Sequence, residues 1–510
     1  MAIRLSGMVS GMDTDAMVKE LVSAYSLKKE SYVKDNTKLD WKKDAWKELN
    51  TKVYKFYTGS LNSMKLMTSF ASKKKCNVSD PNKVSVSANG KVPNGTQSIQ
   101  VKALAQAGYL TGNKIATTSG KDVDYGKTTM SDMGLYSGKI QVNTADGVKD
   151  FTIKAGEKIS EFTERFQKET GIAASFDSGQ QRFVFNSKSG VKNDFNFVAD
   201  TAEQLAGLEK LGLATQEQYT KLGKTPPAQT ATKQDASDAS IIVNGATYTS
   251  DSNTINVNGL TINAMGITDK QVSVTTSTDT DEIYKMVKGF ITEYNDIINE
   301  MTELYNAPTA KDYNPLTDEE KEAMSEKEVE AWEKKIKDSL LRRDDTLGSV
   351  MESMKAGMSA GIKIEGKQYY LSSFGISTMG IMGAEDNKQN AYHIDGDKDD
   401  TSRGDAKDKL RTAIEADPDK VATFFNEMAQ GFYDTMTKKM KSTELRSAYT
   451  IYNDKDMNNQ QIELKKQISS WDKKITEYED SWYKKFAAME SAMSKLQSQT
   501  SSLTSLLGGK

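Results

Sequence analysis

The sequence is poor in the residues on which most enzyme and metal sites depend. Its 510 residues include one cysteine, Cys76, and one histidine, His393. A single cysteine excludes a disulfide within the chain, and Cys76, in the run KKKCNV, is expected to be an exposed thiol rather than a nucleophile. A single histidine excludes a metal site built from several imidazoles. Because no GxSxG motif accompanies it, a hydrolytic triad is not supported either.

Long apolar runs are also missing. The mean hydropathy is −0.63 and 27% of the residues are charged. No stretch reaches the apolar length of a membrane span. The first residues, MAIRLSGMVSGMDTD, lack the apolar core and the cleavage site of a secretory signal. We therefore expect no membrane segment, and either a cytoplasmic protein or export by a route that needs no cleaved signal.

The charges nearly balance, with 68 basic and 71 acidic residues and a net charge of −3. This balance does not suggest a nucleic acid or an anionic membrane as partner. Residues 26–75 are a local exception, because they hold thirteen lysines and only five acidic residues. We expect these lysines to lie on a solvated helix face opposed by acidic surfaces, in preference to a patch that binds lipid or a polyanion.

Two proline-free stretches, 14–67 and 458–507, have the spacing of helices that pair. In the first, large apolar residues recur every seven positions, and in the second they recur every three or four with one stutter after Tyr478. The predicted seam comprises Val18, Tyr25, Tyr32, Leu39, Trp46 and Val53 in the first stretch, and Leu464, Ile468, Trp471, Ile475, Tyr478, Trp482, Phe486, Met489, Met493 and Leu496 in the second. Lys28, Asp35 and Lys42 fill the other half of the first seam, so the isolated pair should be weak and should gain order on assembly.

The region between these stretches changes from helical to alternating periodicity and back. The first helix should begin after Asp13, which suits an N-cap. Alternation from Val78 predicts strands, continued at 139–142, 150–153, 182–186 and 240–276, with a helix at 159–168. From Asp279 onward helices return, with two capping boxes, Thr317 with Glu320 and Ser325 with Glu328, and a break at Pro418.

The expected fold class is α+β multidomain, with the terminal helices paired in a coiled-coil stalk, a helical leg domain and nested β-rich head domains. The expected domains are 1–46 with 455–510 for the stalk, 47–75 with 279–454 for the leg, 76–106 with 237–278 for an inner β head, and 107–236 for an outer β-rich head. Trp41, Trp46, Trp471 and Trp482 are expected to anchor the stalk.

Motifs that would carry chemistry are incomplete. Two GKT triplets, at Gly126 and Gly223, lack the earlier glycine of a phosphate-binding loop. The acidic run of Asp395, Asp397, Asp399 and Asp400 lacks the glycine and the distal glutamate of an EF-hand, and it is expected to be a solvated loop. The adhesion tripeptide at 403–405 arises often by chance. We therefore expect no catalytic residue, no cofactor and no metal, and the protein should not be an enzyme.

Five segments, in order along nearly the whole chain, resemble one known family. They are RLSGMVSGMDTDAMVKELV at the N-terminus, NGTQSIQVKALAQA at 94–107, the flagellin-type repeat FTIKAGEKISEFTERFQKETGIAASFDSGQQRFVFNSKSG at 151–190, IIVNGATYTSDSNTINVNGLTINAMGI with VKGFITEYNDIINEM, and the tail YEDSWYKKFAAMESAMSKLQSQTSSLTSLL. The sequence is similar to the flagellar filament-capping family, hook-associated protein 2 or FliD. It departs from that family's pattern at 315–337 and 395–405.

The resemblance implies a cap at the distal tip of the bacterial flagellum, outside the cell. Such a chain is exported through the flagellar channel without a cleaved signal peptide, and it forms a ring of about five or six copies. The cap prevents leakage of exported flagellin and promotes its folding and insertion as the filament grows. The implied partners are flagellin, the hook–filament junction protein and an export chaperone, with neither nucleic acid nor membrane.

Two other interpretations stay open. The first is a surface adhesin that binds mucin or host glycans through the head domains. The second is another axial flagellar component, such as a junction protein, although the opening SGMVSGMDTD argues against it.

Overall fold

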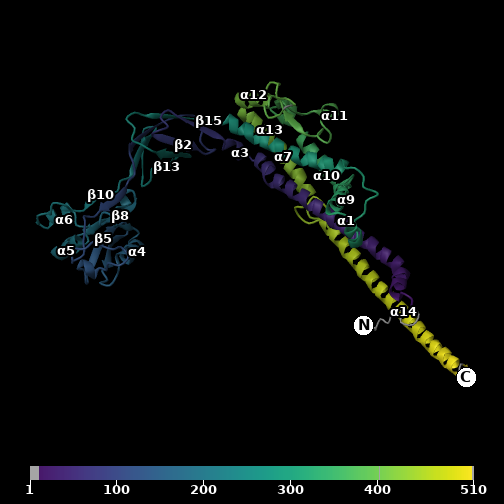
Figure 1. The fold of residues 1–510 in the computed structure, drawn as a ribbon. Helices are drawn as coiled ribbons and strands as arrows, with labels where there is room; N and C mark the ends of the chain where they lie inside the picture. The colour runs from purple at the N-terminus through teal and green to yellow at the C-terminus, as the bar shows by residue number, and fades with distance from the viewer. Residues whose placement is uncertain (1–10, 401, 508–510) are drawn as a thin grey trace. The chain divides into compact units, whose positions relative to one another are not determined.

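The computed structural model describes residues 11–400 and 402–507 (Figure 1). Its contacts divide the chain into two compact units, Met1–Phe70 with Thr280–Lys510, and Ala71–Asp279. The second unit is thus an insertion in the first. The expected stalk and leg segments fall together in the first unit and the two expected β heads in the second, while their finer boundaries stay predictions.

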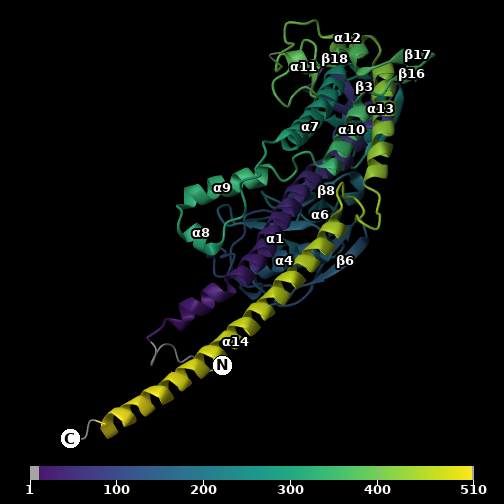
Figure 2. The ribbon, with the colours of Figure 1, turned by 90° about the vertical axis from the view of Figure 1, so that its right-hand side faces the viewer.

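The first unit is helical and is built on two long helices, α1 (Thr14–Thr58) and α14 (Asp454–Leu507), which lie side by side (Figures 1 and 2). The predicted start of α1 is confirmed, because the Asp13 side chain accepts a hydrogen bond from the Ala16 amide at 2.9 Å. The other helices are α2 (Ser60–Met64), α3 (Met67–Ala71), α7 (Thr280–Asn306), α8 (Asp318–Glu322), α9 (Glu326–Asp338), α10 (Asp345–Met358), α11 (Gly380–Gly383), α12 (Lys409–Ala416) and α13 (Pro418–Lys439). Two short hairpins pair β16 (Ile362–Ile364) with β17 (Lys367–Tyr369), and β18 (Ile376–Thr378) with β19 (Tyr392–Ile394).

The core of this unit lies where the C-terminal half of α1 meets α7, α10 and α13. Phe56 stacks on Phe290 and tilts against Phe432, and all three rings are buried. Burying each such ring contributes roughly 1.5–3 kcal/mol. Gly357 of α10 allows the approach of α13, because a Cβ atom there would lie 2.4 Å from Cδ2 of Phe432.

Local signals placed several helix ends correctly. Both predicted capping boxes form, with Thr317 and Ser325 as the N-caps of α8 and α9. The predicted break at Pro418 is also confirmed, because α12 ends at Ala416 and the Asp417 side chain caps α13.

The second unit contains four main sheets. A five-stranded sheet has the order β1-β15-β3-β11-β12, and a three-stranded sheet the order β13-β14-β2. Their strands are β1 (Lys74–Val78), β2 (Val84–Ala88), β3 (Gly95–Ala103), β11 (Ala239–Val243), β12 (Ala246–Ser250), β13 (Thr254–Val257), β14 (Leu260–Ala264) and β15 (Val272–Thr278). Asn244 and Asn258 form the β11–β12 and β13–β14 turns with φ of 49° and 48°, each followed by a glycine with positive φ, as a two-residue hairpin requires.

The other two sheets share a phenylalanine-rich core with three helices. Their strand orders are β10-β4-β8-β7 and β6-β5-β9. The elements are β4 (Ala107–Thr111), β5 (Lys139–Thr144), β6 (Gly147–Thr152), β7 (Ala173–Asp177), β8 (Arg182–Ser189), β9 (Asn196–Val198), β10 (Thr232–Gln234), α4 (Ile159–Thr170), α5 (Ala202–Lys210) and α6 (Gln216–Lys221). The strands predicted at 139–142, 150–153 and 182–186 and the helix at 159–168 are therefore confirmed.

One expectation about this unit is wrong. The alternating region begins at Lys74 and not at Val78, so Cys76 lies within β1. There the thiol is partly buried, 3.8 Å from Oγ1 of Thr276 on β15, and it is not the exposed side chain that its polar neighbours suggested.

Candidate functional site

The two terminal helices run antiparallel. The Tyr483 hydroxyl donates to Asp15 at 2.8 Å, Lys29 Nζ lies 2.6 Å from Asp472, and Lys43 Nζ lies 2.5 Å from Gln461. As residue numbers rise along α1, the numbers of the residues that they contact on α14 fall. Because α1 begins opposite the middle of α14, the C-terminal part of α14 runs on past the start of α1.

The predicted seam residues differ in how far each is buried. Val18, Trp46 and Val53 are buried, and Val53 belongs to the core of the first unit. Tyr25 lies between Trp471 and Tyr478, with ring centroids 6.1 and 4.6 Å away, and Trp46 stacks on Tyr452 at 5.4 Å. The half-buried members are Tyr25, Tyr32, Leu39, Leu464, Ile468, Trp471, Ile475, Trp482, Phe486 and Met489.

Three seam residues of α14 are exposed. Tyr478, Met493 and Leu496 are 44%, 36% and 61% exposed, and the last two lie beyond the start of α1. Sequence reasoning missed Val22 and Tyr452. The spacing of Val22 from Val18, one turn of helix, was the available signal for the first, whereas Tyr452 precedes α14 and follows no period.

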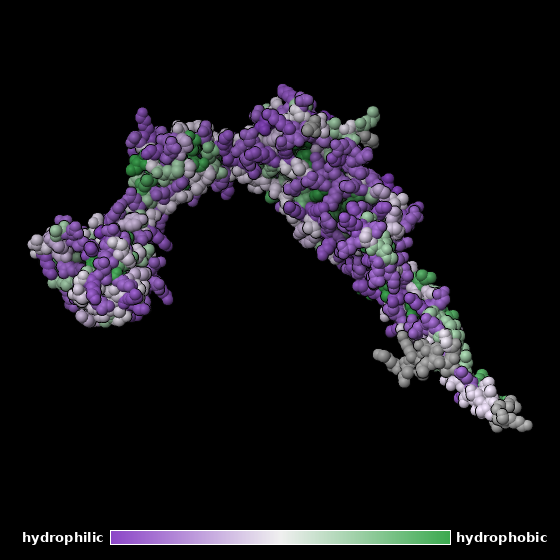
Figure 3. Space-filling model, viewed as in Figure 1, coloured by the Kyte–Doolittle hydropathy of each residue, from purple (hydrophilic) through white to green (hydrophobic). Residues whose placement is uncertain are grey.

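Acidic groups face the lysine-rich side of α1, as the charge pattern predicted. Lys34 Nζ lies 3.3 Å from Glu320, Lys42 Nζ lies 2.8 Å from Asp344, and Lys52 Nζ lies 2.8 Å from Glu300. The hydrogen bond that Lys52 donates to the Glu300 carboxylate raises the pKa of Lys52. Each such solvent-facing pair contributes about 0–1 kcal/mol. The pairs therefore help to orient α8, the start of α10 and α7 on α1 but add little to their stability. Hydrophilic residues cover most of the visible surface of this unit, and hydrophobic ones reach it in small groups (Figure 3).

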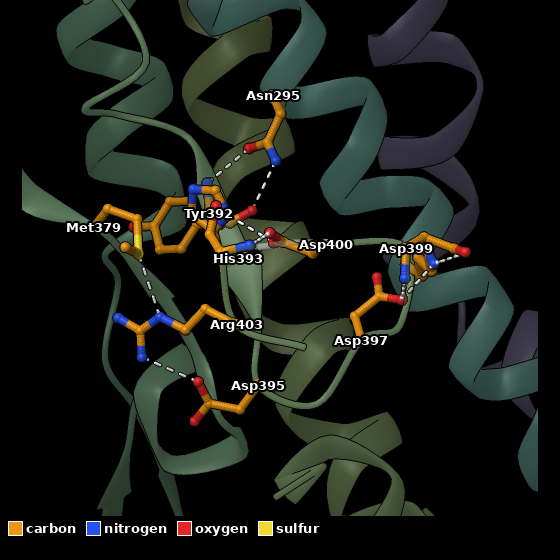
Figure 4. A network of polar contacts seen from close by, with 11 residues as sticks. Asn295, Met379, Tyr392, His393, Asp395, Asp397, Asp399, Asp400 and Arg403 are labelled. Carbon is orange, nitrogen blue, oxygen red and sulfur yellow. Dashed lines mark hydrogen bonds and ion pairs between the residues drawn. The ribbon is translucent and has the colours of Figure 1, made fainter. Parts of the chain in front are cut away.

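The acidic run at 395–400 is not the solvated loop that its composition suggested. Asp395 and Asp397 are 6% and 9% exposed. Asp395 accepts a hydrogen bond from the Arg403 guanidinium at 3.0 Å, and Lys409 Nζ lies 3.4 Å away (Figure 4). Arg403, the first residue of the adhesion tripeptide, is therefore engaged within the fold.

Lys288 of α7 joins two more of these carboxylates. Its Nζ lies 2.7 Å from Asp397 and 2.6 Å from Asp399. Although burial opposes the charge of Lys288, the two carboxylates raise its pKa, and the hydrogen bond from Lys288 lowers the pKa of Asp399. The loop is thereby attached to α7.

His393 completes the network through Asp400. Its Nδ1 lies 2.6 Å from Oδ2 of Asp400, and although burial alone would raise the pKa of Asp400, this hydrogen bond leaves it below the ordinary value. The Asn295 side chain bonds both the amide and the carbonyl of Tyr392, which fixes the strand that carries His393 (Figure 4). No cluster of three or more His, Cys, Asp or Glu side chains that could hold a metal occurs among residues 11–400 and 402–507.

Comparison with known sequences decides the family. The profile described as flagellar hook-associated protein 2 C-terminus matches residues 236–498, and the profile for the N-terminus of the same protein matches residues 10–108. Together the two matches span most of the chain. The chain belongs to the flagellar hook-associated protein 2 family.

Two members of the hook-associated protein 2 family are similar to this chain over three quarters of its length or more. Flagellar hook-associated protein 2 of Halalkalibacterium halodurans is 25% identical over 561 aligned positions, covering 98% of this chain and 99% of the relative. The protein of the same name from Thermotoga maritima is 27% identical, and the match covers 75% of this chain but 56% of the relative's length.

Solved structures of flagellar cap proteins are more distant. The D1-D2-D3 domains of FliD from Escherichia coli give a TM-score of 0.47 at 17% identity, covering 78% of this chain and 97% of that one. FliD from Pseudomonas aeruginosa gives a TM-score of 0.30 at 19% identity, covering 42% and 93%.

Family membership bears on the remaining expectations. Hook-associated protein 2 is a structural, non-enzymatic filament-cap protein, so the chain is not an enzyme. The fold is α+β and multidomain, with long terminal helices in contact and several β-sheet regions. Within the described part of the chain, no helix has the length and apolar character needed to cross a membrane.

Proposed function

We propose that this protein forms the cap at the distal tip of a bacterial flagellar filament, where it retains exported flagellin and promotes its folding and insertion. The match to the hook-associated protein 2 profiles at both ends of the chain is the observation that carries this proposal. No bond chemistry is required for the role, which agrees with the engagement of Asp395, Asp397 and His393 in structural hydrogen bonds and ion pairs.

The paired terminal helices are proposed as the part that reaches the filament tip. Their seam is only partly buried within one copy, and Met493 and Leu496 lie beyond the start of α1. These exposed apolar residues support a seam that other molecules cover when the protein assembles. The proposed assembly is a ring of about five or six copies, and the proposed contacts are flagellin, the junction protein and, before export, a chaperone.

A truncated chain tests the proposal in the bacterium that encodes it. Removing residues 1–40 and 465–510 deletes most of the α1–α14 pair but leaves the second unit and most of the leg core. In a strain lacking the native gene, the full chain should restore swimming, whereas the truncated chain should leave cells non-motile and release soluble flagellin into the medium.

Normal swimming with the truncated chain would contradict the role assigned to the paired helices. Swimming that is normal without any copy of the protein would contradict the cap function itself. Adhesion to mucin glycans, measured with the full-length protein, is the outcome that would favour the adhesin interpretation.

A further inference from the structure

A tyrosine with an unfavourable backbone conformation stands on the surface of the first unit. Tyr449 lies in the loop between α13 and α14 with φ of 63°, a region that non-glycine residues rarely occupy, and 59% of it is exposed. Its amide donates to the Met440 carbonyl at 2.9 Å, and the Asn50 side chain accepts a hydrogen bond from the Ile451 amide at 2.8 Å. The loop therefore holds a strained residue in place in order to display its ring.

One aromatic side chain packs on this ring, and an apolar and a basic residue lie in the same loop. Tyr449 packs edge-on against Tyr54 of α1 with centroids 5.8 Å apart, and Tyr54 and Leu445 are 39% and 50% exposed. In the same loop Arg446 is half-buried, with its Nε inside the fold, and its guanidinium has no ion pair to another described residue. We name Tyr54, Leu445, Arg446 and Tyr449 the Tyr449 knob. It combines exposed aromatic surface with an arginine that has no ion pair to another described residue, and aromatic and arginine side chains are enriched at interface centres.

A complementary hollow lies between α8 and α9. It measures about 580 Å³ and is lined by the apolar side chains of Met324 and Val329. We name it the α8–α9 hollow. Its remaining lining is charged and consists of Lys321, Glu326, Glu330, Glu333, Lys334, Lys337 and Asp338.

The three lysines of this hollow pair with two carboxylates within the chain, so one positive charge remains. Lys321 and Lys337 both pair with Glu333, at 3.0 and 3.1 Å, and Lys334 pairs with Asp338 at 2.7 Å. The exposed carboxylates of Glu326 and Glu330 have no ion pair to any other described residue. Three lysines and four carboxylates leave the lining with one net negative charge, on the side of Glu326 and Glu330, and this charge and the apolar lining match the Tyr449 knob.

The knob and the hollow lie on opposite sides of α1. Lys34 and Trp41 of α1 face the insertion, through Glu320 and Lys337 respectively. Tyr54 follows Trp41 by thirteen residues, which at 100° per residue places it roughly half a turn away around the helix and about 20 Å along it. Figure 2 shows α8 and α9 on one side of α1 and the loop before α14 on the other. One copy of the chain therefore cannot insert its own knob into its own hollow.

We propose that the Tyr449 knob of one copy docks into the α8–α9 hollow of a second copy, where Arg446 meets Glu326 or Glu330. Two different patches on opposite faces make a head-to-tail contact, and such a contact can repeat around a closed ring. The inference rests on the proposed ring and names the surfaces that join its subunits. It also gives α8 and α9, in the segment 315–337 that the sequence marks as an expected insertion, a role in assembly.

Self-association of the full-length protein, measured by analytical ultracentrifugation, tests the knob. Tyr449→Gly removes the ring and suits the positive φ, so it should leave the melting temperature unchanged or higher while raising the dissociation constant at least about tenfold. Tyr136→Gly is the control, because Tyr136 is 70% exposed but lies in the second unit. Arg446→Glu should also weaken association, and adding Glu326→Arg and Glu330→Arg should restore it.

A cysteine pair identifies the contact directly. Val329→Cys combined with Tyr449→Cys, in a Cys76→Ser background, should give a ladder of disulfide-linked oligomers on oxidation, and either cysteine alone should stop at dimers. Rings in the electron microscope without the ladder, and with normal assembly of Tyr449→Gly, would overturn this contact and leave the cap function intact. A protein that stays monomeric at every concentration would also overturn it. The ladder in a protein that fails to restore swimming would support the contact and reject the cap function.

Discussion

At the scale of single residues, the seam between the terminal helices is best tested at Trp471. Its ring lies 6.1 Å from that of Tyr25, so Trp471→Asp places a carboxylate in an apolar contact. Because Trp471 is half-buried and not fully buried, the expected loss is about 1–3 kcal/mol, read as faster hydrogen exchange in the part of α14 that faces α1. Ile475→Asp should act alike, and Lys473→Asp, exposed on the same turn, should have little effect. Equal effects at all three positions would mean that another face of α14 meets α1.

Two helical glycines should respond to alanine in opposite directions. At Gly357 of α10 the new Cβ would collide with the buried ring of Phe432, 2.4 Å away, so Gly357→Ala should destabilise the protein by about 1–3 kcal/mol. At Gly431 of α13 a Cβ has nothing within 4 Å, so Gly431→Ala should stabilise the helix by about 0.5–1 kcal/mol. Thermal unfolding of the two variants measures both signs, and a stabilised Gly357→Ala variant would contradict the packing of α10 on α13.

At the scale of elements, the loop at 395–400 should stabilise the first unit through its ion pairs with Lys288 of α7, and it should not bind calcium. Asp397→Asn leaves Lys288 with one carboxylate, so it should destabilise the first unit by about 1–3 kcal/mol and speed hydrogen exchange at residues 392–400. Calcium should not change the melting temperature, since a ligand stabilises only when it binds the native state. A calcium-dependent rise that Asp397→Asn abolishes would show that the carboxylates hold a cation from solution.

Acid should open the same loop. The pKa values of Asp399 and Asp400 lie below the ordinary 3.8 in the folded protein. Groups with lowered pKa values add stability that is fully present above the unfolded value, and this stability is lost as pH falls below about 4. The protection of residues 392–400 against hydrogen exchange should therefore be constant near neutrality and should decline below that pH. Protection that instead rises on acidification would contradict the ion pairs.

The helix ends and the loop at 395–400 show which features could be predicted from the sequence and which could not. The start of α1 at Asp13, the two capping boxes and the break at Pro418 depend on residues within four positions of each other, and all were predicted correctly. The burial of Asp397 was not, because its cationic partner Lys288 lies 109 residues away along the chain. An acidic run looks solvated whenever its partners are brought by tertiary structure, and periodicity carries no information about that.

The seam shows the same limit in another form. The three- and four-residue spacing of apolar residues in α14 identified the face that meets Tyr25. The same spacing continues through Met493 and Leu496, which lie beyond the N-terminal residue of α1. A repeat marks which residues share a face, and only the second helix determines how much of that face is covered.

At the scale of the whole molecule, the antiparallel pairing of α1 with α14 constrains the time at which the parts can fold. The bond between Tyr483 and Asp15 joins residues 468 positions apart, whereas the second unit is complete within residues 71–279. Contacts of such long separation form late, because the intervening chain must first be brought together. If the chain leaves a narrow channel one end at a time, the terminal helix that emerges first has no partner until the other terminal helix has also emerged. In the proposed export route the order of arrival becomes the order of folding, and the helix pair proposed to reach the filament is the last part to fold.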